Sequence, residues 1–202
     1  VIGSGIGGII TLSEQWSVLN EKGPSRVNPF LVPMMLGDMA SGQVSILFGA
    51  KGPNYCTVTA CSSGADAIGI AAKMIINGEI DIAIAGGTEA PICPIAVSGF
   101  NACMALSKNN DDPQKASRPF DRGRDGFVMG EGSGVLILES EKSVLNRSAN
   151  PIVELAGYGA SSDAFHVTQP AEGGEGAARA MKIALEAAGM SPTDISYINA
   201  HG

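Results

Sequence analysis

The sequence predicts a layered α/β fold, because strand-like segments alternate with segments of helical spacing along its 202 residues. The run IDIAIAGG at 80–87 is apolar apart from Asp81, which is typical of a strand in a sheet covered on both faces. The chain is 45% hydrophobic and only 16% charged, and it contains 27 glycines. This composition is that of a densely packed globular protein with close backbone contacts.

Each element in the first part of the chain has a local reason. Apolar side chains recur at helical spacing from Ile9 to Leu19, and Asn77-Gly78 is a good C-terminal signal for a helix. The Met- and Leu-rich stretch at 33–48 is apolar nearly all round, so we expect a buried helix there. We expect helices over 9–20, 33–48, 62–77 and 94–104, strands over 54–60, 80–87 and 133–139, and loops over 20–30 and 107–126.

The pattern restarts at Asn150-Pro151. From there we expect a strand over 152–161, a long loop to Gly174, a helix over 175–189 and a strand over 195–200. The restart indicates a second βα half, which divides the chain into residues 1–149 and 150–202.

Composition and charge exclude several function classes. The net charge of −7 argues against general nucleic-acid binding, no apolar run reaches the length of a membrane span, and no secretory signal opens the chain. The four cysteines include no CxxC pair, so a structural zinc site is not expected, and free thiols fit a reducing, cytosolic compartment. The chain starts without Met and stops after an apolar run, so we expect it to be part of a longer protein.

The motif GSGIGG at 3–8 fits the dinucleotide fingerprint GxGxxG. The residues some 20 positions later form a loop, NEKGPSRVN, rather than a strand that ends in an acid. We therefore interpret these glycines as sites of close strand–helix packing.

Cys61 is the strongest candidate for chemistry. It lies where the apolar run TVTA gives way to a helix of small residues, at the carboxyl edge of the expected sheet. The N–H groups and the positive dipole end of that helix favour thiolate over thiol, and the same amides could donate to an oxyanion. Cys56, Cys93 and Cys103 are interpreted as packing residues.

The two histidines differ in setting. His201, in YINAHG, follows a strand-like run and is a candidate proton manager for the Cys61 thiol. If the two halves pack as similar units, both residues face one cleft. His166 lies in a long loop and is expected to be structural or part of a pocket wall.

The segment SRPFDRGRDGFVMGEGSG contains six charged side chains among closely spaced glycines. We expect internal ion pairs to brace a tight hairpin here, and direct chemistry by Glu131 is the minor alternative.

Five motifs, in order along the chain, together resemble one family: TACSSGADAIG, AGGTEAPICPIAVSGF, ASRPFDRGRDGFVMGEGSGVLILE, SSDAFHVTQP and NAHG. They look like the elongating β-ketoacyl-acyl carrier protein synthases of type II fatty acid synthesis. The resemblance implies a thiolase-like fold of α-β-α-β-α layers, present here in part, and usually a homodimer. It implies no metal or redox cofactor, and acyl carrier protein as the partner.

The resemblance also implies roles for particular residues. Cys61 would carry the growing acyl chain as a thioester, and His201 would stabilise the enolate left when malonyl-carrier protein loses CO2. Leu36 matches the floor of the acyl pocket, and Arg26 and Lys108 match basic positions that face the acidic carrier protein. The second catalytic histidine, the lysine and the phenylalanine gate of the family would lie beyond residue 202, so we expect the chain alone to be inactive.

Three alternatives remain open. A polyketide ketosynthase would share Cys61 and His201, whereas a non-catalytic chain-length subunit would typically lack the nucleophile. A Rossmann dehydrogenase would use Gly3, Gly5 and Gly8 to bind a nicotinamide cofactor. The acyl chain length and the host compartment, bacterial cytosol or organelle, are not determined by the sequence.

Overall fold

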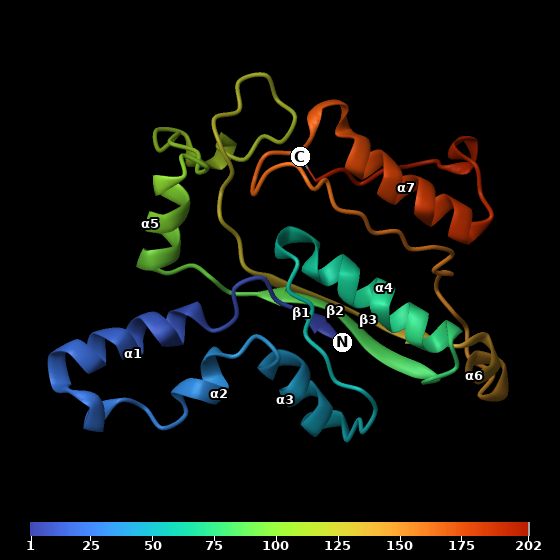
Figure 1. The fold of residues 1–202 in the computed structure, drawn as a ribbon, viewed down its shortest axis with the longest axis horizontal. Helices are drawn as coiled ribbons and strands as arrows, with labels where there is room; N and C mark the ends of the chain where they lie inside the picture. Colours follow the sequence, from blue (N-terminus) through green and yellow to red (C-terminus); the bar gives the residue numbers. More distant parts are fainter. Residues whose placement is uncertain (202) are drawn as a thin grey trace. The chain divides into compact units, whose positions relative to one another are not determined.

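The protein is described by a computed structural model that covers residues 1–201. Two parts of the chain are each compact (Figure 1). The first unit contains residues 1–71 and 83–138, and the second unit contains residues 72–82 and 139–201.

The first unit is built on a three-stranded sheet. Its strands are β1 (Ile2–Gly3), β2 (Ile82–Glu89) and β3 (Gly132–Glu139), in the order β1-β2-β3. β1 runs parallel to the central strand β2, with Ile2 opposite Gly86. The strands predicted at 80–87 and 133–139 are therefore confirmed.

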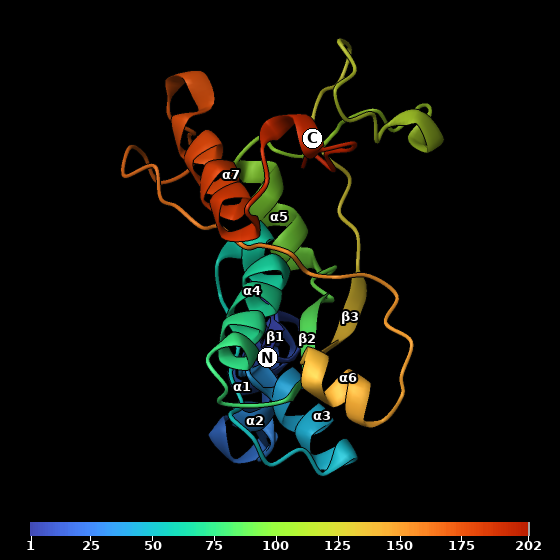
Figure 2. The same cartoon turned by 90° about the vertical axis from the view of Figure 1, so that its right-hand side faces the viewer.

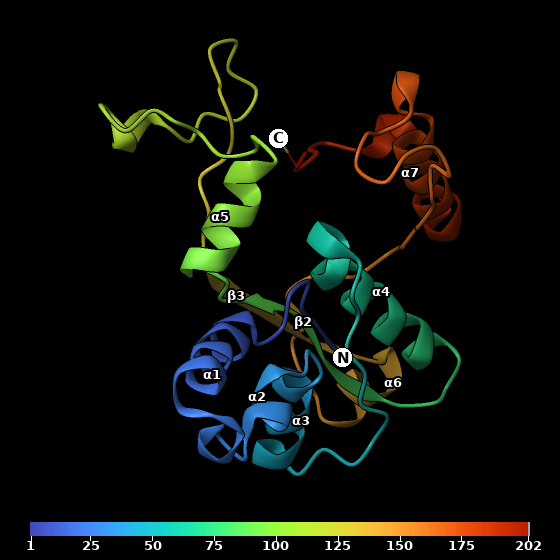
Figure 3. The same cartoon turned by 60° about the vertical axis from the view of Figure 1, so that its left-hand side comes forward.

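Helices flank this sheet. They are α1 (Ile9–Lys22), α2 (Leu31–Met35), α3 (Met39–Phe48), α4 (Ser63–Ile76) and α5 (Pro94–Ala102). Figures 1, 2 and 3 show α4 on one side of the sheet and α1, α2 and α3 on the other. The buried apolar residues of the first unit include Ala67 and Ala71 of α4 and Ala83 and Ala85 of β2, and such small side chains allow helix and strand to approach closely.

The glycines of the β1–α1 segment allow close backbone approach, as predicted. A β-carbon at Gly3 would collide with the carbonyl group of Ser63 at the start of α4 and would lie 2.8 Å from Thr57 Oγ1. A β-carbon at Gly8 would likewise collide with the backbone of α2 at Met34.

Replacing Gly3 with alanine is expected to lower the free energy of unfolding of the full-length protein by about 2 kcal/mol, because the colliding atoms are backbone that cannot move aside. Denaturant unfolding measures the change. Gly99→Ala in α5 is the matched control, since no atom lies within 4 Å of its β-carbon, and it is expected to be neutral or slightly stabilising. Equal unfolding midpoints for the two variants would contradict the assigned packing role.

The single buried helix predicted over 33–48 is wrong. The structure has two helices, α2 and α3, interrupted at residues 36–38, where Leu36 takes an extended conformation. Gly37 at this break lies against the β1–α1 turn, since a β-carbon on Gly7 would lie 3.3 Å from it. The C-terminal turn of α3 is exposed, with Phe48 68% accessible, because no described segment covers that end of the helix.

The strand predicted over 54–60 is also absent. The segment nevertheless runs beside β1, because the amides of Ile2 and Ser4 donate to the carbonyls of Tyr55 and Thr57, each at 3.2 Å. Two bonds position the segment without making a regular strand. The predicted end of α4 is confirmed, since the helix ends at Ile76 and Gly78, two residues later, has φ +74°.

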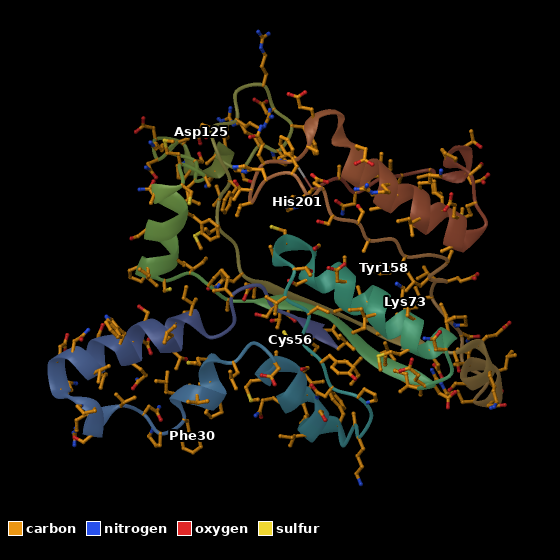
Figure 4. All side chains as sticks on the ribbon, in the orientation of Figure 1. Phe30, Cys56, Lys73, Asp125, Tyr158 and His201 are labelled. Atoms are coloured by element: carbon orange, nitrogen blue, oxygen red, sulfur yellow. The ribbon has the colours of Figure 1, made fainter. Side chains whose placement is uncertain are left out.

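The second unit contains α6 (Glu141–Asn146) and α7 (Glu175–Ala188), and the helix predicted over 175–189 is confirmed. α7 lies against residues 157–161, where the Ser161 hydroxyl donates to the Gly176 carbonyl at 2.6 Å. Figure 4 shows Lys73 and Tyr158, whose ammonium nitrogen and ring centroid are 5.2 Å apart. The Arg147 guanidinium, with help from the Ser143 hydroxyl, lowers the pKa of Glu139 to about 2.

The strands predicted over 152–161 and 195–200 are not formed among the described residues. Both segments are apolar, and Ile152 is 97% exposed and Tyr197 80% exposed. A strand is defined by its hydrogen-bonded neighbour, and no described segment pairs with either stretch.

Short 3-10 turns complete the chain at Pro24–Arg26, Ala60–Ser62, Pro113–Lys115, Glu172–Gly174 and Pro192–Asp194. Within residues 1–201, none of the helices has the length and apolar character needed to cross a membrane.

Candidate active site

Cys61 lies at the start of α4, as the sequence predicts. It is the middle residue of the 3-10 turn Ala60–Ser62, and α4 begins two residues later at Ser63. The thiol is exposed in this chain. The Ser63 amide donates to the Ala60 carbonyl, so the 3-10 turn runs directly into α4. The positive end of the α4 dipole lies close to Cys61 in sequence, so this end of the helix can stabilise an oxyanion.

The turn that carries Cys61 has an unusual backbone. Ala60 has φ +53°, in the left-handed region that residues other than glycine rarely adopt. The Ser63 hydroxyl donates to the Ala60 carbonyl at 2.6 Å and accepts from the Thr59 amide at 2.9 Å. Thr57 Oγ1 in turn donates to the Ser63 carbonyl at 2.7 Å. These bonds fix the backbone on both sides of Cys61.

The left-handed conformation of Ala60 could not be predicted from the sequence, because the residue is not glycine or asparagine. It also did not identify Asp66, whose carboxylate accepts hydrogen bonds from the Thr59 and Ser62 hydroxyls. The spacing of four residues between Ser62 and Asp66 on one helix was the available signal.

The other three cysteines differ in how far they are buried. Cys93 is buried ahead of α5 and Cys56 is half-buried, which agrees with their interpretation as packing residues. Cys103 is exposed, so its assignment to packing is wrong within this chain. The reason is its place directly after the last turn of α5, where the helix ends at Ala102.

His201 belongs to the second unit, whereas Cys61 belongs to the first, so each is described within its own unit. His201 is exposed and follows the extended segment 195–200 (Figure 4). His166 has a structural role, as predicted, because its Nδ1 atom accepts from the amides of Thr168 and Gln169 at 3.2 and 3.0 Å. It also lines a shallow hollow formed by residues 162–167.

The three weaker candidates all lie in the first unit and are exposed. Leu36 is at the break between α2 and α3, with 42% of its surface accessible. Arg26 ends the 3-10 turn that follows α1. Lys108 lies in the loop over 107–126, and its amide donates to Asp125 at 2.9 Å.

Bonds to Asp125 anchor that loop at its base. The Ser107 hydroxyl and the Lys108 amide, both donating to the Asp125 carboxylate, hold its pKa below the ordinary range. A bridge between Leu106 and Phe127 closes the loop, and the Phe127 ring packs edge-on against Phe100 with centroids 5.3 Å apart.

The ion pairs predicted within SRPFDRGRDGFVMGEGSG are wrong, since none joins two of its described residues. The charged groups instead bind backbone and hydroxyl groups: Asp121 accepts from the Gly123 amide, and the Arg124 guanidinium donates to the Asp121 carbonyl. Glu131 accepts from the Ile92 amide at 2.8 Å, which gives it a bracing role. A glycine-rich backbone exposes many amides, and these compete with the arginines for the carboxylates.

The backbone amides of the GxGxxG turn donate to a carboxylate of the chain itself. Glu89 at the end of β2 accepts from the Gly5 and Ile6 amides at 2.6 and 3.0 Å, and from the Ser4 hydroxyl at 2.9 Å. A carboxylate of the chain thus takes the position where a dinucleotide phosphate would bind. In the described part of the chain, no group of three His, Cys, Asp or Glu residues is arranged to hold a metal ion.

Known proteins resemble the whole chain. It is 55% identical over 201 residues to 3-oxoacyl-[acyl-carrier-protein] synthase 2 of Staphylococcus aureus, and 54% identical over 202 residues to the Synechocystis protein of the same name. The chain spans about half the length of these relatives, 50% and 49%.

Solved structures share the fold. A β-ketoacyl synthase from Burkholderia phymatum is 36% identical with a TM-score of 0.91, and the match covers this whole chain and 48% of that one. A chain in the complex of a type II PKS acyl-carrier protein with its ketosynthase is 35% identical with a TM-score of 0.93, covering 51% of that chain. The α/β ketosynthase fold, thiolase-like and present in part, is therefore confirmed.

Family profiles match almost the full length. The β-ketoacyl synthase N-terminal domain matches residues 1–143, and the C-terminal domain matches residues 152–202. A cysteine on a strained turn at the head of a helix, in a fold shared with solved ketosynthases, agrees with these matches. The chain belongs to the β-ketoacyl synthase family.

Proposed function

We propose that the full-length protein catalyses the decarboxylative condensation that elongates fatty acids by two carbons. The position of Cys61 at the head of α4 is the observation that carries this proposal. The relatives named 3-oxoacyl-[acyl-carrier-protein] synthase 2, at 54–55% identity, support it.

In the first transfer, the Cys61 sulfur attacks the carbonyl carbon of an acyl thioester on the carrier protein. A tetrahedral oxyanion forms near the amides of the α4 N-terminus and collapses, so that the carrier thiol leaves and the acyl group stays on Cys61. The exposed thiol and the small side chains of Ser62, Ser63 and Gly64 leave room for this approach.

In the second transfer, malonyl-carrier protein loses CO2 and leaves an enolate. His201, as a neutral donor, stabilises the enolate oxygen, and the enolate carbon attacks the thioester carbonyl on Cys61. The carbon–sulfur bond to Cys61 breaks, which frees the thiolate and gives a β-ketoacyl chain on the carrier. The two transfers predict ping-pong kinetics.

Further parts of the proposal concern binding. Leu36 forms the floor of the acyl pocket, and Arg26 and Lys108 contact the acidic carrier protein. The anchoring of the Lys108 backbone by Asp125 supports that contact, because a fixed loop loses less entropy on binding. Local basic side chains can steer such a partner even though the chain carries a net charge of −7.

The assembly and organisation are proposed as follows. The protein is a homodimer. It is located in the cytoplasm, and the four free cysteines support this compartment because thiols stay reduced there. The boundary between its two thiolase-like halves lies at residues 149/150, supported by family matches that end at residue 143 and resume at residue 152.

The full-length enzyme should be incubated first with acyl-carrier protein and then with malonyl-carrier protein, without any reductase. We expect the acyl mass on the peptide that contains Cys61, followed by one β-ketoacyl product longer by two carbons.

A polyketide ketosynthase is the second candidate function, and the resemblance to a type II PKS ketosynthase supports it. This alternative predicts repeated extension of the same acyl chain. If no cysteine-containing peptide carries the acyl mass, both functions are contradicted.

A further inference from the structure

The turn before Cys61 is strained, and a strained backbone persists only where its surroundings hold it. Ala60, at φ +53°, lies between Thr59 and Cys61. Any group that fixes Thr59 on one side and Ser62 on the other therefore controls where the Cys61 sulfur lies.

Asp66 is such a group. It lies one turn into α4, half-buried, and its carboxylate accepts from Thr59 Oγ1 and, at 3.3 Å, from Ser62 Oγ. The Ser62 hydroxyl shares its one proton between this carboxylate and the Thr59 carbonyl, to which it donates at 2.8 Å. Side chains on both sides of Ala60 and Cys61 are thus tied to one carboxylate.

The chemistry proposed above makes no use of this carboxylate. A negative charge in the first turn favours the helix. The hydrogen bonds of this carboxylate to the residues that flank Ala60 and Cys61 indicate a geometric role as well.

We infer that Asp66 is a positioning residue for the condensation, which holds the strained Ala60–Cys61 turn by binding the Thr59 and Ser62 hydroxyls. This inference rests on the proposed function. Transfer of an acyl group to Cys61 needs the sulfur and the α4 amides in one fixed arrangement, whereas alkylation by a small reagent makes much weaker geometric demands.

Thr59→Val in the full-length enzyme removes one of these hydroxyls without changing charge. We expect acylation of Cys61 by acyl-carrier protein to slow about tenfold at saturating substrate, with KM nearly unchanged, while the rate of iodoacetamide alkylation stays within about twofold. Thr59→Ser retains the hydroxyl and should restore the acylation rate. The double variant Thr59→Val/Asp66→Ala should be no slower than Asp66→Ala alone, because both remove the same bond.

The outcomes separate this inference from the function on which it rests. If the unmodified enzyme takes no acyl group on Cys61, both fail. If the unmodified enzyme is acylated, and Thr59→Val and Asp66→Ala are acylated at the same rate but melt at a lower temperature, then Asp66 has only a structural role. In that case the inference alone is overturned. If Thr59→Val does not fold, Ser62→Ala gives the same test, because Ser62 is exposed. We expect its rate of Cys61 acylation to fall about threefold. An unchanged acylation rate would contradict the inference.

Discussion

Replacing Cys61 with alanine in the full-length enzyme is expected to abolish condensation, with a loss of at least about a thousandfold in kcat. The reason is that alanine offers no sulfur to hold the acyl chain, so the reaction cannot be divided into two transfers. Steady-state formation of β-ketoacyl product measures the loss, and mass spectrometry should find no acyl group on the variant.

Cys103→Ala is the matched control, because Cys103 is the other exposed cysteine of the first unit. It follows the last turn of α5 rather than preceding the first turn of a helix, and it has no assigned role in the chemistry. We expect its activity to stay within about twofold of the unmodified enzyme. Equal losses in the two variants would show that exposed thiols matter only for folding, and would remove Cys61 from the mechanism.

Replacing His201 with alanine is expected to separate the two transfers. Condensation should fall about a hundredfold, because loss of one donor to a developing oxyanion typically has an effect of this size. Acylation of Cys61 should continue at nearly the normal rate, since the α4 amides serve that step. Rapid-quench mass spectrometry would therefore show acyl-enzyme that accumulates and is not consumed by malonyl-carrier protein.

His166→Ala provides the comparison, since His166 is the other histidine of the sequence and its Nδ1 atom accepts from backbone amides within its own loop. Its effect on condensation is expected to be within about twofold. If His201→Ala instead blocks acylation and leaves the condensation of preformed acyl-enzyme intact, His201 acts in the first transfer and the proposed division of roles is wrong.

Helices with a clear local signal were predictable. The apolar spacing in α1, the small-residue run and Asn77-Gly78 ending of α4, and the pattern of α7 each depend on residues within the helix itself. The break at Leu36–Asp38 was not predictable, because it depends on the contact of Gly37 with Gly7, thirty residues earlier in the chain.

Strands were predicted less well, because a strand requires a partner. The run at 80–87 formed β2 between two neighbours, whereas the equally strand-like runs at 152–161 and 195–200 have none among the described residues. Similarly, the arginines and carboxylates of residues 117–134 suggested ion pairs, but nearby amides and hydroxyls bind those carboxylates instead.

The sequence alone was sufficient to identify Cys61 at a helix start and to indicate the family, because a helix N-terminus and a long motif are local properties of the chain. The strained φ of Ala60, the carboxylate of Asp66 that ties Thr59 to Ser62, and the occupation of the glycine-rich turn by Glu89 appeared only in three dimensions. These features depend on which groups the folded backbone brings within hydrogen-bonding distance, and residue identities do not specify those distances.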